Sequence, residues 1–381
     1  MEIIEGMNRN ITRKVIIKNF FRNLYRNLFK ELKKWIWELD KVVFFSIFFL
    51  EFLSSITVLK LSYIMSNRFK TSMDLIFFFK HFVFIFISII LIFIFSRLEW
   101  KTARKYAIYI FFIALSLNFV TIIFGQKSNG VRRWIRFGSF SLQSSEFLKA
   151  LIIIPITQYL MESDHKKVIK LLSISVISCL LQPDLGMTFL IISSSVSLIF
   201  LRGENFSHYI KIVLISLCGL FFSGAFLAKY ALNRIMIFFG KKEGFQISQS
   251  LKALSTSTLF GEKDHIYIPD SHCDFIFAEI VSTFGILIGI LIISIPISLF
   301  FYVINKTKNY EEGEKYIALG IVNQLCIQSY LHILSNLAFI PTKGLNLPFV
   351  SFGGSSLMAH SISIGCLLNI LKKKLMLFRN K

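Results

Sequence analysis

The amino-acid sequence predicts an all-α fold, a polytopic membrane protein with about ten transmembrane helices. Of its 381 residues 54% are hydrophobic, and 43 are Phe, which is more apolar surface than a soluble domain of this size can bury. The apolar residues also fall into runs of about twenty, the length at which a helix crosses a bilayer. Such segments must satisfy their own backbone hydrogen bonds, which favours helices over open sheets.

The first 41 residues form a basic arm. They contain ten Lys or Arg residues, and Phe20, Leu24 and Leu28 lie between these at helical spacing. This pattern fits an amphipathic helix lying on the cytoplasmic membrane surface. A solvated basic tail fits it equally well, so both interpretations remain open. No short apolar region with a small-residue cleavage site follows, so we expect no cleaved signal peptide.

Residues 42–371 are predicted to form one transmembrane domain, followed by a basic tail over 372–381. The candidate spans lie near 42–64, 75–95, 105–124, 146–160, 168–182, 186–201, 209–230, 274–302, 316–340 and 353–371. The fifth span is short and is followed directly by Pro183. Because proline ends or kinks a helix, the assignment of this segment as a span has the weakest support of the ten.

The charges between the spans predict the orientation. The arm, the 97–105 loop and the tail are all rich in Lys and Arg. The positive-inside rule places these three segments, and therefore both termini, in the cytoplasm. The outer side then receives loops near 125–145, 231–273 and 341–352. The net charge of +21 is thus assigned to membrane orientation and to anionic lipid head groups, and no nucleic-acid partner is expected.

The 125–145 loop departs from this rule. It contains Lys127, Arg132, Arg133 and Arg136 and no acid before Glu146, although it is predicted to lie outside. Basic residues on that side oppose correct insertion, so a function that requires an anionic ligand would account for them. Contact with lipid phosphates would account for them as well. The charge pattern alone leaves both possibilities open.

Ionisable residues occur within or beside several spans, where they often mark function. Glu146 and Lys149 are three residues apart and share a helix face, so they can form an ion pair directed into the bundle. Alternatively, each reaches the interface and stays hydrated. Asp184, between Pro183 and Gly186, is expected to cap the next helix, and an acid at that depth could also hold a cation.

Asp274 is the strongest candidate for a catalytic residue. It ends the long outer loop and comes just before the apolar run of the eighth span. A carboxylate there faces the outer mouth of the bundle, where it could act as a general base. The alternative is that Asp274 caps the following helix, whose dipole would favour the charged carboxylate. Residue type and position do not decide between these roles.

A metal site is only weakly indicated. Asp264, Asp270 and Asp274 with His265 and His272 could bind a divalent cation, but their spacing matches no diagnostic metal motif. Gly353, Gly354, Ser355 and Ser356 open the last span. Small residues there allow close packing of helices, and the hydroxyl groups can bond between helices.

Four segments together resemble the SEDS family of shape, elongation, division and sporulation proteins. The first runs from Gly130-Val131-Arg132-Arg133-Trp134-Ile135 to Gln143-Ser144-Ser145-Glu146 and Lys149. The second is Gln182-Pro183-Asp184-Leu185-Gly186. The third is Pro269-Asp270-Ser271-His272-Cys273-Asp274-Phe275-Ile276-Phe277-Ala278. The fourth contains Pro341-Thr342-Lys343-Gly344 and Leu347-Pro348-Phe349-Val350-Ser351-Phe352-Gly353-Gly354-Ser355-Ser356. Their order and their setting among ten spans agree with the family over about residues 42–371. The form of the fourth segment favours the division branch.

The resemblance implies a peptidoglycan glycosyltransferase that polymerises lipid II on the outer face of the inner membrane during division. It assigns the catalytic base to Asp274. It assigns substrate binding to Arg132, Arg133, Trp134, Glu146, Lys149, Asp184, His272, Lys343, Ser355 and Ser356. Arg133 would hold the diphosphate of the donor through two parallel hydrogen bonds, and Trp134 would pack on a sugar or on the lipid near its head. No cofactor is assigned, and a divalent cation, Mg²⁺ or Mn²⁺, stays open.

The resemblance also implies a class B penicillin-binding transpeptidase and other membrane proteins of the division machinery as partners, and a location at the septum. Ser144, Asp270 and Cys273 depart from the family pattern, which has Pro, Glu and Thr at these positions, and the outer loop around Gly261 is shortened. Two other functions remain alternatives, because composition does not separate them from polymerisation: a flippase that moves lipid II across the bilayer, and a non-catalytic scaffold of the division machinery.

Overall fold

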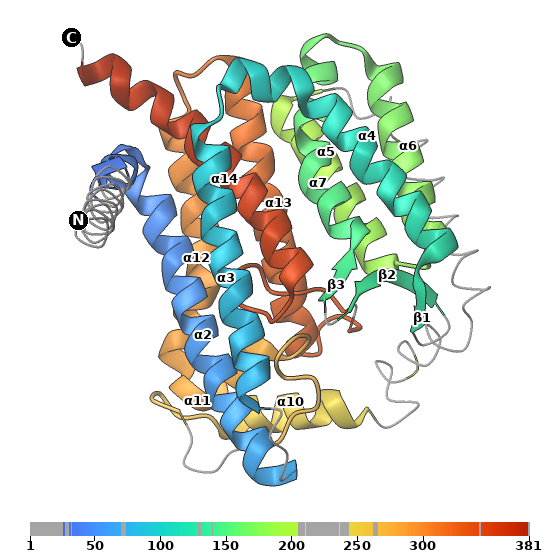
Figure 1. Cartoon of the computed structure of the whole chain (residues 1–381), viewed down its shortest axis with the longest axis vertical. Coiled ribbons are helices and arrows are strands. Elements are labelled where there is room, and N and C mark those ends of the chain that lie inside the picture. The colour runs from blue at the N-terminus through green and yellow to red at the C-terminus, as the bar shows by residue number, and fades with distance from the viewer. Residues whose placement is uncertain are drawn as a thin grey trace, which may run out of the picture.

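The structure is a computed structural model that describes residues 26, 30–31, 33–69, 74–128, 131–138, 140–204, 210, 236, 244–261, 266–342 and 344–379. Its long helices run side by side as a bundle (Figure 1). They are α2 (Lys41–Phe69), α3 (Asp74–Arg97), α4 (Trp100–Phe124), α5 (Ser144–Met161), α6 (His165–Leu181), α7 (Leu185–Arg202), α12 (Ile286–Lys306), α13 (Glu312–Asn336) and α14 (Gly354–Arg379).

The helices confirm the expected membrane architecture. Seven helices in the described part of the chain are long and apolar enough to cross a membrane, and they contain seven of the predicted spans or most of each. The fourth and fifth predicted spans correspond to α5 and α6, which have 18 and 17 residues. The predicted span over 209–230 falls almost entirely outside the described residues. The described helices are therefore consistent with the prediction of about ten spans.

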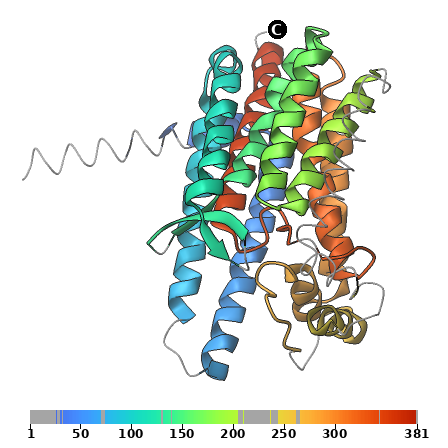
Figure 2. The same ribbon diagram turned by 90° about the vertical axis from the view of Figure 1, so that its right-hand side faces the viewer.

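A small antiparallel sheet occupies the segment that was expected to be a loop. Its strands are β1 (Gln126–Ser128), β2 (Val131–Phe137) and β3 (Phe140–Gln143), in the order β1-β2-β3. Phe137 pairs with Phe140, so two residues connect β2 to β3, and the first of them, Gly138, has a φ of 58°. This left-handed conformation suits glycine and is typical of tight hairpins. The sheet lies beside the ends of α4 and α5 (Figure 2).

The eighth predicted span is two helices. α11 (Ile276–Phe284) ends at Gly285, which has a φ of 94°, and α12 begins at the next residue. A Cβ atom on Gly285 would lie 2.1 Å from the carbonyl oxygen of Leu259, so only glycine fits this close approach. The long outer loop also contains a helix, α10 (Phe245–Thr256), which lies across the end of the bundle (Figure 1).

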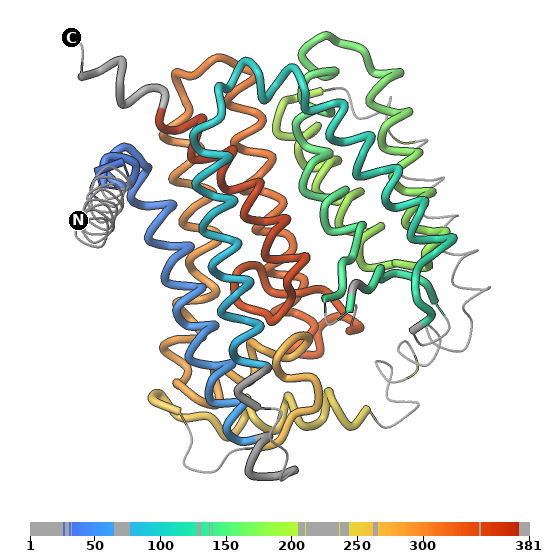
Figure 3. Tube along the Cα trace, viewed as in Figure 1, coloured from blue at the N-terminus to red at the C-terminus, as the bar shows by residue number. Residues whose placement is uncertain are grey.

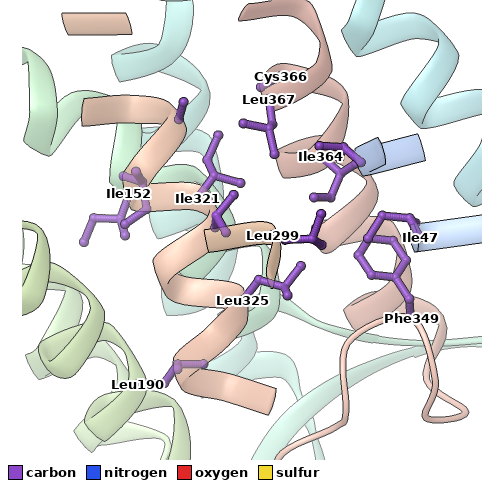
Figure 4. Close-up of a cluster of buried hydrophobic side chains, with 14 of the residues drawn as sticks. Ile47, Ile152, Leu190, Leu299, Ile321, Leu325, Phe349, Ile364, Cys366 and Leu367 are labelled. Atoms are coloured by element: carbon purple, nitrogen blue, oxygen red, sulfur yellow. The ribbon is translucent and has the colours of Figure 1, made fainter. Parts of the chain in front are cut away.

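The core lies around α13 and α14. These two spans are mostly buried within the bundle, whereas only 28% of the most apolar window of α3 and of α12 is buried, and many of their large apolar side chains are exposed. α14 packs extensively against α3, although more than 250 residues separate them in sequence (Figure 3). Side chains from α2, α5, α12, α13 and α14 meet in the buried cluster of Figure 4. The exposed apolar faces are those expected of helices in contact with lipid.

The described end of the N-terminal arm is helical over residues 33–38 and is attached to the bundle. The buried indole of Trp35 donates a hydrogen bond to Ser96 Oγ at 2.7 Å, and Glu38 forms an ion pair with Lys372 of α14 at 2.6 Å. Most of residues 1–32 lie outside the described chain, so the choice between an amphipathic helix and a basic tail stays open there. The two ends of the transmembrane domain lie together, as the predicted orientation requires.

Candidate active site

Asp274 lies in a turn that precedes α11. Its backbone N–H donates to the carbonyl of Asp270 at 3.1 Å, and the residue is half-buried. The residue that caps α11 is Phe275, with no side-chain capping bond. Asp274 therefore lies one residue before the N-cap position of this helix. The turn that carries its carboxylate lies at the end of the bundle where α10 and the sheet also lie.

Asn336, the last residue of α13, holds this turn in place. It is fully buried, and its Nδ2 donates to the carbonyl of Asp274 at 2.9 Å. Its Oδ1 accepts from the N–H of Ala278 at 3.2 Å, and its own carbonyl accepts from Ser250 of α10 at 2.9 Å. The Asn336 side chain thus joins the turn that carries Asp274, here called the acidic turn, to α11. The Asn336 backbone joins α13 to α10. Such bonds restrict where the Asp274 carboxylate can move.

Residues 347–356, here called the bridging segment, attach to the acidic turn on one side. Phe352 N–H donates to the carbonyl of His272 at 2.8 Å, and Ser351 Oγ donates to the carbonyl of Cys273 at 2.8 Å. Asn336 donates to the carbonyl of the next residue, Asp274. Three consecutive carbonyls of the turn, those of residues 272–274, therefore each accept a hydrogen bond from elsewhere in the fold. The backbone before the candidate base is therefore fixed.

The same segment attaches to the sheet on its other side. Ser355 Oγ accepts from the N–H of Gln143 at 2.9 Å and donates to the carbonyl of Ser141 at 3.3 Å. The third and fourth sequence motifs are thus bonded to each other, and the fourth is bonded to the first. The predicted placement of Asp274 and the basic segment at one end of the bundle is confirmed. Because Ser355 bonds within the protein, its contact with substrate stays a prediction.

The three arginines of the basic segment lie on β2, which is partly buried, and Lys127 lies on β1. Arg133 donates from Nε to the carbonyl of Gln182 at 3.2 Å and from Nη2 to the carbonyl of Pro183. Arg132 donates to the carbonyl of Ile123. Trp134 pairs with Gln126 on one side and with Gln143 on the other. Arg133 therefore helps to join the sheet to the turn between α6 and α7, and three of its five N–H groups take no part in these bonds.

Asp184 caps a helix, as expected from its position after Pro183. Its Oδ1 accepts from the N–H of Met187 in the first turn of α7 at 3.3 Å. Its Oδ2 accepts from Gln143 Nε2 at 3.0 Å and from Ser145 Oγ at 3.3 Å. The cap interpretation is confirmed, and the second motif is bonded to the end of the first. The structure leaves a substrate or cation contact of Asp184 untested.

Glu146 and Lys149 form the predicted ion pair inside the bundle, and both side chains are at most 1% exposed. The alternative that they reach the interface is wrong. Lys149 Nζ also donates to Gln328 Oε1 at 2.8 Å, and the same oxygen lies 3.1 Å from His360 Nε2. His360 Nδ1 lies 3.4 Å from Ser356 Oγ, so the pair continues through α13 to α14. A buried charge pair is tolerated when further hydrogen bonds satisfy its polar atoms.

His272 is enclosed by aromatic rings. Its ring centroid lies 5.1 Å from that of Phe77 and 5.9 Å from that of Phe352. Burial lowers the pKa of His272 below its ordinary value, and the nearby Asp270 carboxylate opposes this shift only in part. A neutral imidazole results at neutral pH, because desolvation penalises the charged form. His272 is thus suited to hydrogen bonding with a substrate but not to serving as a fixed positive charge.

Sequence reasoning missed three residues that join these groups: Gln328, Asn336 and His360. Each is a polar side chain within or at the end of an apolar span, and that position was the signal that could have identified them. Lys343, Asp264 and His265 lie outside the described residues. Within the described ranges, no group of three or more His, Cys, Asp or Glu side chains is placed to hold a metal ion.

The comparisons with known proteins agree with this arrangement. Residues 40–375 match the family model of the FtsW, RodA and SpoVE cell cycle proteins. The probable peptidoglycan glycosyltransferase FtsW of Coxiella burnetii is 30% identical over 322 residues, which cover 77% of this chain and 86% of that protein.

Two solved structures share the fold. One chain of a peptidoglycan synthase complex that coordinates polymerization and crosslinking superposes with a TM-score of 0.70, covering 88% of this chain and 98% of that one at 19% identity. The rod shape determining protein RodA of Thermus thermophilus gives a TM-score of 0.64 at the same identity, covering 88% of this chain and 97% of that one. The family match over nearly the whole transmembrane domain, together with the four motifs at one end of a shared fold, shows that the chain belongs to the FtsW/RodA/SpoVE family of cell cycle proteins.

Proposed function

We propose that this membrane protein is a peptidoglycan glycosyltransferase of the division branch, which polymerises lipid II into glycan strands on the outer face of the cytoplasmic membrane. The observation that carries the proposal is the bridging segment. It is bonded both to the turn that holds Asp274 and to the strand beside the basic residues of β2. A carboxylate and a group of cations at one end of a membrane bundle suit a sugar donor that carries a diphosphate.

The reaction assigns complementary roles to these groups. Asp274 accepts the proton from the acceptor hydroxyl as that oxygen attacks the anomeric carbon of the donor sugar. A new carbon–oxygen bond forms, and the bond to the undecaprenyl diphosphate breaks with its electron pair on the diphosphate. The Asp274 carboxylate is placed for this task by Asn336, which fixes the backbone around it.

The basic strand supplies positive charge for the leaving group. Residues 132, 134 and 136 alternate with residue 133 along β2, so Arg132, Trp134 and Arg136 share the face opposite to Arg133. Arg136 is exposed, whereas Arg133 is half-buried. Arg132 and Arg136 would therefore contact the diphosphate from one face of the sheet, and Arg133, on the other face, would add to the positive potential of the site. Lys343 and Ser356 complete the proposed substrate contacts.

A divalent cation is compatible with this site. Mg²⁺ is commonly bound by one or two carboxylates together with the phosphates of the substrate. The carboxylate of Asp274 could supply a protein ligand for Mg²⁺ or Mn²⁺, and the diphosphate of the donor could supply others. Such a cation would reduce the negative charge that develops on the leaving group.

The partner we propose is a class B penicillin-binding transpeptidase at the division septum. The support is the shared fold with a chain of a peptidoglycan synthase complex that couples polymerization to crosslinking. The positive-inside pattern, with both ends of the domain held together by the Glu38–Lys372 pair, supports cytoplasmic termini and an outward-facing site.

The test is Asp274→Asn in the purified protein with its transpeptidase partner, supplied with lipid II. We expect polymer to fall by about a hundredfold or more on a gel, since removing a general base typically costs 10²–10⁴ in rate. Asp270→Asn is the matched control, because Asp270 is exposed in the same turn and accepts from Gln246 at 2.8 Å. This control should retain most of the polymerisation.

Three outcomes would contradict the proposal. An unchanged amount of polymer with Asp274→Asn would show that Asp274 is not the general base. Transfer of lipid II across vesicles without any polymer, from the unmodified protein, would favour the flippase. Binding of the transpeptidase with neither activity would favour the scaffold.

A further inference from the structure

A recess lies at the end of the bundle that carries the N-terminal arm, away from the turn that holds Asp274. It has a volume of about 620 Å³ and lies among the helical residues 33–37, α2, α3 and α14. Its lining includes Trp35, Phe48, Ile89 and Ile364. Its volume lies within the range of about 300–1,000 Å³ that small-molecule sites occupy. The four sequence motifs do not contribute to it.

The interior of this recess suits a hydrocarbon chain. Apart from Lys33 at its edge, the acid Glu51 is the ionisable group of its lining. Glu51 is 3% exposed, and its Oε1 accepts from Ser88 Oγ at 2.5 Å. Ser88 Oγ lies 2.6 Å from Ser361 Oγ on α14, so the carboxylate is bonded within the bundle. The rest of the lining is aliphatic and aromatic, and it opens where helices face lipid.

The edge of the recess is basic. Lys33 and the exposed Trp37 both line it, and Lys41 Nζ lies 4.5 Å from the centre of a Trp37 ring. The neighbouring acids are paired with other cations, in the ion pairs Glu31–Arg97, Glu38–Lys372 and Asp40–Lys306. Among the described residues, Lys33 and Lys41 form no ion pair, so their charges remain available. Tryptophan and lysine together are typical of the membrane interface.

We propose that this recess binds one acyl chain of an anionic phospholipid from the cytoplasmic leaflet, with its phosphate at Lys33 and Lys41. The apolar interior accepts the chain, and the uncompensated lysines select a negative head group. The bound chain would also shield the Glu51–Ser88–Ser361 bonds from water. The site is distinct from the outer-face site for the diphosphate-linked sugar donor.

The test is native mass spectrometry of the purified full chain after exchange into detergent, followed by titration with phosphatidylglycerol and phosphatidylcholine. We expect one phosphatidylglycerol to remain bound and to outcompete phosphatidylcholine. Ile89→Trp fills the recess and should lower its lipid occupancy at least about tenfold. Ile90→Trp is the matched control, because Ile90 is the next residue on α3, is similarly exposed and does not line the recess. It should behave as the unmodified chain does.

The head-group preference is tested separately. Lys33→Gln should lower the preference for phosphatidylglycerol about fivefold, since one lysine near a lipid surface contributes about that factor. Lys34→Gln, on the neighbouring exposed residue that does not line the recess, should leave it unchanged. Equal lipid retention in the Ile89 and Ile90 variants, equal binding of the two phospholipids, or a bound mass matching a polyprenyl diphosphate would each overturn the proposal.

Discussion

Arg133 makes its observed contacts inside the protein, with the carbonyls of Gln182 and Pro183. Hydrogen bonds to charged groups contribute about 1.5–3 kcal/mol each. Arg133→Ala is therefore expected to lower both the melting temperature in detergent and donor binding. Arg136→Ala should weaken donor binding without a loss of stability, because Arg136 is exposed on β2.

Thermal unfolding and lipid II binding of the two variants distinguish these effects. If Arg133→Ala reduces binding and leaves the melting temperature unchanged, its bonds to the turn contribute nothing to the fold, and its role lies with the substrate alone. The comparison matters because the sequence placed both arginines in a single basic loop, whereas the sheet directs them to opposite faces.

Single residues of the candidate site were predictable where a motif or a charge in an apolar context identified them. Glu146 and Lys149 stood out as charges at helical spacing, and they form a buried pair. Asn336 did not stand out, because an amide near the end of an apolar span is a common feature. Its importance depends on two backbone groups, at Asp274 and Ala278, that lie about 60 positions earlier in the sequence and reach it only in the folded bundle.

Among the elements, the junction between α11 and α12 depends on one glycine. Gly285→Ala would place its Cβ 2.1 Å from the carbonyl oxygen of Leu259, at a φ of 94°. Backbone strain of this kind costs about 1–3 kcal/mol before the steric overlap is relieved. We expect a clearly lower melting temperature and weaker polymerisation, because α11 follows directly from the turn that holds Asp274.

Gly203→Ala is the matched control for the junction. Gly203 also has a positive φ, 79°, but a Cβ there would meet no heavy atom within 4 Å. Gly203→Ala should therefore lower the melting temperature only by the effect of the backbone strain. Similar losses of melting temperature in the two variants would show that the close approach to Leu259 is not needed for the fold.

Helices were easier to predict than the features between them. The spans were visible because an uncharged apolar run of about twenty residues is characteristic of a helix that crosses a bilayer. The sheet was not, since the sequence Val-Arg-Arg-Trp-Ile-Arg-Phe over 131–137 lacks strict alternation and its charges drew attention to a ligand. The break at Gly285 was also hidden, because the apolar run continues through both helices and an isolated glycine within it does not by itself mark a break.

For the whole molecule, orientation in the membrane is the property on which the proposed function depends. Cysteine introduced at Lys127, exposed on β1, should react with a membrane-impermeant maleimide in intact spheroplasts of a strain that expresses a cysteine-free variant. Cysteine introduced at Lys308, exposed between α12 and α13, should react only after the membrane is opened. The reverse pattern would place the sheet and Asp274 in the cytoplasm, where they could not extend a glycan strand.

The double attachment of the bridging segment has a consequence for processive synthesis. A growing strand must advance by one disaccharide after each cycle, so something at the site has to move. Ser351 Oγ donates to the carbonyl of Cys273, and Ser355 Oγ accepts from the N–H of Gln143. These two bonds attach the turn that carries Asp274 and the sheet that carries the arginines to one short stretch of chain. The distance between Asp274 and the arginines is therefore fixed by the bridging segment. Translocation would then consist of movement of the polymer relative to these residues, which stay in place.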